Sequence, residues 1–339
     1  MGQLSGSAKR YSVAPSVPPT RHRAPAQKVS ESNLKTIRII GVGSCSQVRL
    51  ARLKASGISV AMKVIKKVNV LTTKQIAHVF AEKQILKLVE SPFIVSFLGS
   101  FQNTTNLYCV MEYVPGGELF HFLCHRGTLL SSEAAFYAAE VTMAFCTLHA
   151  IKCVYRDLKP ENVLISASGH IKLTDFGLAK LLSHGEKAYT TCGIPEYISP
   201  EVIRGEGYDE NCDWWQLGVL LYEMIAADTP FNSQCPYELY SNILTKKVEF
   251  TNAFDDTTQD LISKLLHKDA SKRIPQREIL KHDFFAGMCW EQVNELRLTP
   301  PFIPTLSDPL DSSYFDDFTE KAEEDLTTEA SLQTVFDGY

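Results

Sequence analysis

The sequence of 339 residues lacks the features of secreted, membrane-spanning and nucleic-acid-binding proteins. No apolar run approaches the ~18 residues of a membrane helix, and no apolar core of a signal peptide follows the N-terminus. The nine cysteines are odd in number and include no C-x-x-C pair, so neither a disulfide framework nor a zinc or redox site is expected. A net charge of −5 provides no global attraction for nucleic acid. We therefore predict reduced thiols, no transmembrane segment, no nucleic-acid partner, and a cytoplasmic location, alone or together with a nuclear one.

Charge is distributed unevenly along the chain. Residues 1–32 have a net charge of +4 and contain four prolines among serines and alanines, which predicts a flexible basic arm. Residues 306–339 have a net charge of −9, and the part between these two ends is neutral. The sequence begins Met1-Gly2, but Gly6 stands where the N-myristoylation pattern requires Ser or Thr. N-terminal acylation is therefore the less favoured alternative.

The neutral part predicts a β-rich segment followed by a helical one. Short runs rich in β-branched residues predict strands at 37–41, 48–53, 58–65 and 106–114, and apolar residues at helical spacing predict one helix at 75–89. Further helices are predicted at 131–149, which begins with Ser131 and Glu133 as start signals, and then at 213–226, 238–244, 257–266 and 276–281. This order favours an α+β fold with a small β-rich lobe, a larger helical lobe and a ligand site between them.

A glycine-rich turn lies between the first two strands. Its residues, GVGSCSQV, run from Gly41 to Val48. Backbone N–H groups in such a turn can lie over phosphates, because glycine lets the main chain approach closely. Ser46 stands where the G-x-G-x-x-G pattern has its third glycine, and taken alone the turn fits an ordinary β-hairpin better.

A lysine and a glutamate form the next pair of interest. Lys63 lies on the third predicted strand, and Glu82 follows 19 residues later within the predicted helix. A lone lysine on a strand is usually solvated, whereas a lysine held by a carboxylate can bind phosphate oxygens as a fixed charge.

The segment YRDLKPEN, residues 155–162, is the most specific signal. Asp157 can accept a hydroxyl proton, Lys159 can lie against a phosphoryl group, and Asn162 can bind Mg²⁺. Thirteen residues after Asn162, Asp175 begins the motif DFG and adds a carboxylate for the same metal. Together these motifs predict phosphoryl transfer from Mg-ATP.

With these motifs the chain resembles the eukaryotic protein kinases of the AGC class, particularly the cyclic-AMP-dependent type, over residues 34–336. The resemblance implies a bilobal protein-kinase fold. Residues 1–32 would be the arm, 33–117 the N-terminal lobe, 118–285 the C-terminal lobe, and 286–339 a tail that wraps onto the N-terminal lobe. A cyclic-GMP-dependent type of kinase and, as a non-enzyme, a pseudokinase scaffold remain alternatives. Ser46 and Ile194, the latter standing where the family has threonine, motivate the scaffold.

The resemblance assigns the nucleotide site by position. The catalytic residues would be Asp157, Lys159, Lys63 and Glu82, with Asn162 and Asp175 as ligands of Mg²⁺. Leu86, Phe97, Tyr155 and Phe176 would form a stack that aligns the lobes. The ATP-binding set would comprise Ile40, Gly41, Val42, Gly43, Ser44, Cys45, Ser46, Gln47, Val48, Ala61, Lys63, Met111, Glu112, Val114, Glu118, Leu164, Thr174 and Phe315.

The resemblance also implies the protein partners. Substrates would carry arginine before the phosphoacceptor, bound by Glu118, Glu161 and Glu223, and an apolar residue after it, bound by Thr191, Pro195 and Ile198. Thr190 would be phosphorylated and would face three cations, Arg156, His78 and Lys180. Glu201 would pair with Arg273, and Asp213 would anchor the catalytic loop. An inhibitory regulatory subunit is expected to act in trans.

Overall fold

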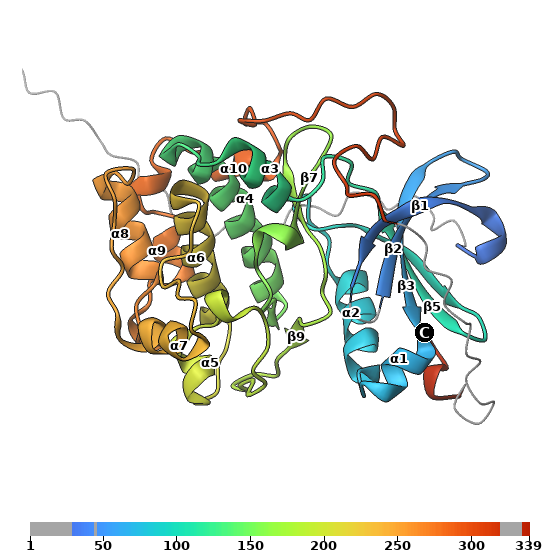
Figure 1. Cartoon of the computed structure of the whole chain (residues 1–339), viewed down its shortest axis with the longest axis horizontal. Coiled ribbons are helices and arrows are strands. Elements are labelled where there is room, and N and C mark those ends of the chain that lie inside the picture. Colours follow the sequence, from blue (N-terminus) through green and yellow to red (C-terminus); the bar gives the residue numbers. More distant parts are fainter. Residues whose placement is uncertain (1–28, 44–45, 319–333) are drawn as a thin grey trace, which may run out of the picture.

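Two lobes of different composition make up residues 29–43, 46–318 and 334–339, which this computed structural model describes (Figure 1). The predicted basic arm, Ser44 and Cys45, and much of the acidic tail lie outside the described residues. The bilobal α+β fold is confirmed, whereas the predicted boundaries of arm, lobes and tail stay predictions.

The N-terminal lobe is built on one antiparallel sheet in the order β1-β2-β3-β5-β4. Its strands are β1 (Leu34–Val42), β2 (Ser46–Leu53), β3 (Ser59–Lys66), β4 (Phe97–Gln102) and β5 (Asn106–Glu112). The sequence predicted four of them and missed β4. Gly99 and a burial pattern without alternation weaken the local signal of β4, which pairing with β5 nevertheless holds in the sheet.

Two helices complete the N-terminal lobe: α1 (Lys67–Thr72), which the sequence did not predict, and α2 (Ile76–Leu88), which it did. Helix α2 buries Val79, Ile85 and Leu86, and on the same helix it buries the carboxylate of Glu82. The apolar contacts therefore fix the position of this charged residue.

The C-terminal lobe is mainly helical. It comprises α3 (Leu119–Arg126), α4 (Ser131–Ala150), α5 (Pro200–Arg204), α6 (Asn211–Ala226), α7 (Pro236–Thr245), α8 (Asp256–Leu265), α9 (Gln276–Ile279) and α10 (Trp290–Asn294). Helices α4 and α6 are buried almost all round, as expected of the central helices of a lobe.

Four very short strands frame the loops between α4 and α5. Strand β6 (Cys153–Val154) pairs with β9 (Lys180–Leu181), and β7 (Val163–Ile165) pairs with β8 (Ile171–Leu173). Strands of two or three residues give no periodic signal, and the sequence did not predict them. The segment 155–162 runs between β6 and β7 and is thus held at both ends.

Helix α4 begins at Ser131, as predicted, and only the residue that caps it needed the structure. Its N-cap is Leu130, and Ser131 is already in the first turn. Glu133 Oε2 accepts a hydrogen bond from Leu130 N at 2.9 Å, so the glutamate satisfies the start of the helix and the serine side chain is not the cap.

One hydrophobic core connects the lobes. It contains the four residues of the predicted stack, Leu86 and Phe97 from the N-terminal lobe and Tyr155 and Phe176 from the C-terminal lobe, each no more than 6% exposed. The rings of Tyr155 and Phe176 meet edge to face with centroids 5.2 Å apart. Leu86 of α2 belongs to the same core as these two rings, which lie beside the polar site.

Residues 309–317 and 336–339 of the tail lie against the N-terminal lobe, as predicted, whereas α10 and Phe302 pack against the helical lobe. Figure 1 shows the tail running from the helical lobe to the sheet. Arg38 in β1 forms an ion pair of 3.0 Å with Asp317, and Tyr113 OH donates to the carbonyl of Asp311 at 2.6 Å. Near the C-terminus, Phe336 is fully buried in a cluster of its own with residues of β3, α1 and α2.

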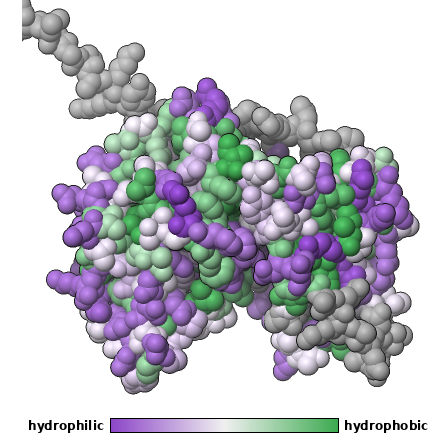
Figure 2. Space-filling view, turned by 45° about the horizontal axis from the view of Figure 1, so that its top comes forward, coloured by the Kyte–Doolittle hydropathy of each residue, from purple (hydrophilic) through white to green (hydrophobic). Residues whose placement is uncertain are grey.

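Among the described residues, no helix has the length and apolar character needed to span a bilayer. Figure 2 shows the two lobes as separate masses with an indentation between them, and with hydrophilic and hydrophobic residues mixed. The eight cysteines of the described part form no disulfide with one another.

Candidate active site

Lys63 lies at the centre of a carboxylate pair where the lobes meet. Its Nζ is 2.7 Å from Glu82 Oε1 and 3.0 Å from Asp175 Oδ1, and its side chain is 11% exposed. Burial by itself opposes the charge, but the carboxylates of Asp175 and Glu82 raise the pKa of Lys63. The predicted pair is confirmed, and Lys63 is a fixed cation facing the site.

Asp213 in α6 anchors the segment 155–162, as predicted. Its carboxylate accepts hydrogen bonds from Tyr155 N at 2.9 Å and Arg156 N at 2.8 Å, and it lies 2.7 Å from His149 Nε2. Arg156 has a φ of +69°, a conformation that costs energy in a residue other than glycine and persists because these contacts hold it.

Asp157 is buried and points into a small polar cluster. Asn162 Nδ2 donates to both Asp157 O and Asp157 Oδ2 at 2.8 Å, and Lys159 Nζ lies 3.3 Å from Oδ2. Burial raises the pKa of Asp157 despite the nearby lysine. The carboxylate is held in one orientation and keeps Oδ1 for a hydroxyl group of a substrate.

Asn162 and Asp175 fit a divalent cation by the chemistry of their free groups. The amide nitrogen of Asn162 is committed to Asp157, so the carbonyl oxygen is the group available as a ligand. Lys63 lowers the pKa of Asp175, whose side chain is 48% exposed and can therefore bind a cation as a carboxylate. Mg²⁺ takes oxygen ligands of this kind.

The predicted ATP-binding residues come from β1 and β2 with the turn between them, from β3, from β5 and the connection after it, from β7, from the residue after β8 and from the tail. Ala61 is paired with Met111 in the sheet, and Glu118 and Leu164 form a β-bridge on the other side of the connection. Ser44 and Cys45 lie outside the described residues. Contact with the nucleotide stays a prediction for the whole set: Ile40, Gly41, Val42, Gly43, Ser46, Gln47, Val48, Ala61, Lys63, Met111, Glu112, Val114, Glu118, Leu164, Thr174 and Phe315.

One contact of the interlobe connection was not predicted. Glu112 Oε1 accepts a hydrogen bond from Ser96 N at 2.6 Å and pairs with Lys172 Nζ at 2.9 Å. Lys172 also donates to the carbonyl of Pro92 at 3.0 Å. A lysine of β8 in the C-terminal lobe therefore links two segments of the other lobe, and no local motif marks it.

The three carboxylates expected to bind arginine lack cationic partners among the described residues. Glu223 accepts a hydrogen bond from Tyr197 OH, and Glu161 Oε2 is buried without a hydrogen-bond partner. Burial and the carboxylates of Glu161 and Asp316 raise the pKa of Glu118 to about 7. These groups would gain a counter-ion from a bound guanidinium.

The residues expected to bind the following apolar residue differ in exposure. Ile198 is buried in a cluster with Tyr208, whereas Thr191 and Pro195 are exposed. A pocket formed by the three stays a prediction.

The surroundings of Thr190 differ from the expectation. Thr190 is exposed, and its carbonyl accepts a hydrogen bond from Tyr208 OH at 2.6 Å, while Arg156 Nη1 donates to the same hydroxyl at 3.0 Å. Lys180, which was expected to face a phosphate on Thr190, forms an ion pair with Glu186: Lys180 Nζ lies 2.9 Å from Glu186 Oε1. Glu186 is a residue that the sequence analysis missed.

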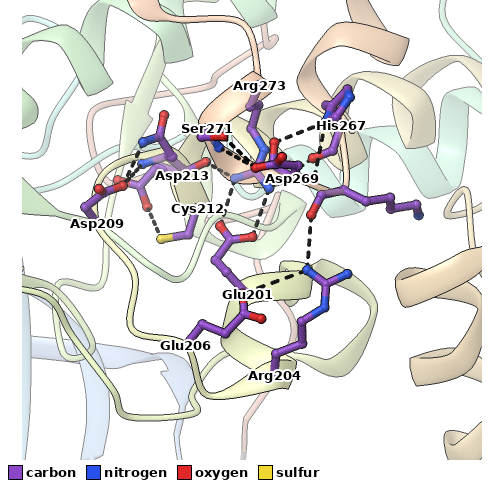
Figure 3. A network of polar contacts seen from close by, with 12 residues as sticks. Glu201, Arg204, Glu206, Asp209, Cys212, Asp213, His267, Asp269, Ser271 and Arg273 are labelled. Carbon is purple, nitrogen blue, oxygen red and sulfur yellow. Dashed lines mark hydrogen bonds and ion pairs between the residues drawn. The ribbon is translucent and has the colours of Figure 1, made fainter.

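Figure 3 shows the polar network around the predicted pair of Glu201 and Arg273. The two guanidinium nitrogens of Arg273 donate to the two oxygens of Glu201 at 2.8 and 2.9 Å, and the side chains are 0% and 7% exposed. Arg273 also donates to the carbonyl of Asn211 at 2.6 Å. This confirmed pair ties α5 to the start of α6 and to the segment after α8.

Ile194 directly follows Gly193, whose backbone lies close to the segment 155–162, and has no hydroxyl group to offer there. A Cβ atom on the preceding Gly193 would be 3.2 Å from the carbonyl oxygen of Arg156, which shows how closely the two segments approach. Ile194 is half-buried and packs against the main core. Asp157 and Lys159 contact each other directly at 3.3 Å.

This arrangement agrees with the comparison with known families. Residues 34–285 match the family described as the protein kinase domain. The chain belongs to the protein kinase family. The pair formed by Lys63 and Glu82, the segment around Asp157 and the motif of Asp175 all lie within the matched part.

Three relatives describe the branch of this kinase family. A Caenorhabditis elegans protein named cAMP-dependent protein kinase, catalytic subunit-like, is 38% identical over 323 residues, which cover 94% of this chain and 79% of the relative. The Mus musculus cAMP-dependent protein kinase catalytic subunit PRKX is 40% identical over 91% of this chain and 88% of its own length. The Homo sapiens serine/threonine-protein kinase Sgk2 is 43% identical over 84% of this chain and 80% of its own length. The chain is a protein serine/threonine kinase of the AGC type.

Proposed function

We propose that this kinase transfers the γ-phosphoryl group of Mg-ATP to serine or threonine in proteins that carry arginine before the phosphoacceptor. The contacts of Lys63 with Glu82 and Asp175 carry the proposal, because they create a fixed cation beside an exposed carboxylate. When bound, Mg-ATP supplies the phosphoryl group and a divalent charge on its phosphates. Asn162 and Asp175 would hold the metal.

The roles of the other residues follow from their contacts. Lys63 binds phosphate oxygens while Glu82 keeps its ammonium group in place. Asp157 orients the attacking hydroxyl and accepts its proton, and Lys159 neutralises charge that develops on the transferring group. Positioning and electrostatic stabilisation of this kind account for most catalysis of phosphoryl transfer.

The carboxylates of Glu118, Glu161 and Glu223 support the proposed substrate class. They are partly buried and unpaired with any cation in the described residues, and a charged hydrogen bond to a guanidinium contributes about 1.5–3 kcal/mol. A protein region with arginine before the phosphoacceptor provides such groups.

Regulation is proposed on two grounds. An inhibitory cyclic-nucleotide-binding subunit would act in trans, since two relatives are named as catalytic subunits of cAMP-dependent kinases. Phosphorylation of Thr190 would act in cis, since the side chain is exposed and lies near the cation of Arg156. A cytoplasmic or nuclear location stays a prediction.

The test compares two peptides, one with arginines before its serine and one with alanines in their place. Glu161→Ala and Glu223→Ala are expected to raise KM for the arginine peptide strongly and KM for the alanine peptide and for ATP little. Glu249→Ala is the matched control, because Glu249 is 80% exposed. Equal effects on both peptides would refute the substrate class, and an absence of all turnover would favour a pseudokinase.

A further inference from the structure

Glu186 forms an ion pair with Lys180, a cation that the sequence analysis expected to bind a phosphate on Thr190. Its Oε1 lies 2.9 Å from Lys180 Nζ, and both side chains are 39% exposed. Lys180 was one of the three cations expected to gather around phosphorylated Thr190. In this structure it already has an anionic partner within the same loop.

The other oxygen of the Glu186 carboxylate closes a turn. Oε2 accepts a hydrogen bond from Ser183 N at 2.9 Å, and the backbone N of Glu186 donates to the carbonyl of Ser183 at 3.0 Å. These bonds to Ser183, followed by the charge of Lys180, lower the pKa of Glu186 to about 2. The carboxylate is ionised at neutral pH and joins two points of the loop.

Both ends of this loop are tied to the catalytic machinery. Lys180 pairs with Val154 in the two-stranded sheet of β6 and β9, and Val154 directly precedes the catalytic segment 155–162. At the other end, Ala188 and Tyr208 exchange two backbone hydrogen bonds of 2.8 and 2.9 Å. The hydrogen bond from Tyr208 OH to Thr190 O then fixes the backbone of the proposed phosphorylation site itself.

We propose that Glu186 is a positioning residue that holds the loop 180–190 in its active arrangement when Thr190 carries no phosphate. A phosphate on Thr190 would offer Lys180 a stronger anion, and because two anions near one lysine repel each other, the contribution of Glu186 would fall. Unphosphorylated enzyme therefore has basal activity that depends on Glu186. The part of the inference that concerns phosphate rests on the proposed modification of Thr190.

The test measures peptide kinetics of Glu186→Gln in two forms of the full chain, phosphorylated and phosphatase-treated, with the state of Thr190 verified by mass spectrometry. In the unphosphorylated form the variant is expected to lower kcat by about two- to five-fold, the range of an exposed ion pair, with KM for ATP unchanged. In the phosphorylated form kcat is expected to equal that of the wild type. Glu206→Gln is the matched control, because Glu206 is 60% exposed and its ion pair with Arg204 is weak, with 4.0 Å between Oε2 and Nη1.

Equal losses of kcat in both forms would overturn the inference and assign Glu186 a purely structural role. No loss in the unphosphorylated form would overturn it as well. If Thr190 never carries phosphate, the double variant with Lys180→Gln decides: a loss no greater than that of either single variant supports the ion pair as the positioning unit, and additive losses refute it. Hydrogen exchange of residues 180–190 compares the wild type with Glu186→Gln without measuring catalysis. A failure of the proposed function can therefore be told apart from a failure of this inference.

Discussion

Recognition of arginine is expected to weaken as the pH falls from 8 to 6, because Glu118 loses its charge in that range. Glu118 is the N-cap residue of α3, and burial together with the carboxylates of Glu161 and Asp316 raises its pKa to about 7. A protonated carboxyl group cannot form an ion pair with a guanidinium. The arginine of a substrate therefore binds the ionised form of Glu118. Below pH 7 most Glu118 carboxyl groups carry a proton, which must leave before the arginine binds.

The magnitude follows from this pKa. A group with a pKa of about 7 is ionised in about nine tenths of the molecules at pH 8 and in about one tenth at pH 6. If only the ionised form of Glu118 binds the arginine, KM for an arginine peptide rises about ten-fold over this range, equivalent to about 1.4 kcal/mol of binding free energy.

The assay measures KM for the arginine and alanine peptides at pH 6, 7 and 8 with saturating ATP. Glu118→Gln is expected to keep KM for the arginine peptide high at every pH, while Glu249→Gln follows the wild type. The reasoning is refuted if KM for both peptides rises equally, or if the rise persists in Glu118→Gln. Titration of Asp157 does not confuse the result, because it affects both peptides alike.

Three further outcomes are expected. Asp157→Asn lowers kcat by about 10²–10⁴-fold while calorimetry shows unchanged ATP binding, and turnover within a factor of two of the wild type would contradict its role. Arg273→Met lowers the free energy of unfolding by about 3–5 kcal/mol in urea titrations, since it strands the buried Glu201, whereas Arg277→Met, at a side chain that is 82% exposed, has little effect. Ile194→Thr raises kcat by adding a hydroxyl beside the catalytic segment, and a lower kcat at an unchanged melting temperature would show that the site is built around isoleucine.

The main elements and the chemistry of the site were predictable from the sequence, because both are encoded locally. Alternating and helical spacing of apolar residues marked β1, β2, β3, β5 and the long helices to within a few residues. The glycine turn, the lysine on β3 and the segment 155–162 are each local in the sequence. Their functional groups can therefore be recognised without knowledge of the fold. The order of a strand lysine and a helix glutamate suggested the pair of Lys63 and Glu82, the resemblance paired Glu201 with Arg273, and the structure confirmed both pairs.

The remaining elements form only through tertiary contacts. Strand β4 and the strands β6 to β9 are too short or too irregular to have a periodic signal, and neighbouring strands hold them in place. The cap of α4 shows the same limit on a smaller scale. The sequence placed the start of the helix correctly at Ser131, but the hydrogen bond from Leu130 N to Glu133 Oε2 is visible only in the structure.

For other charged residues, only the tertiary structure decided the partners. Lys180 could meet a phosphate on Thr190 or the carboxylate of Glu186, and the turn at Ser183 brings the carboxylate to it. Lys172 reaches the connection between the lobes because β8 packs against it. The sequence determined which charges exist, whereas the fold determined which of them meet, because electrostatic energy depends on distance and burial that a linear chain does not contain.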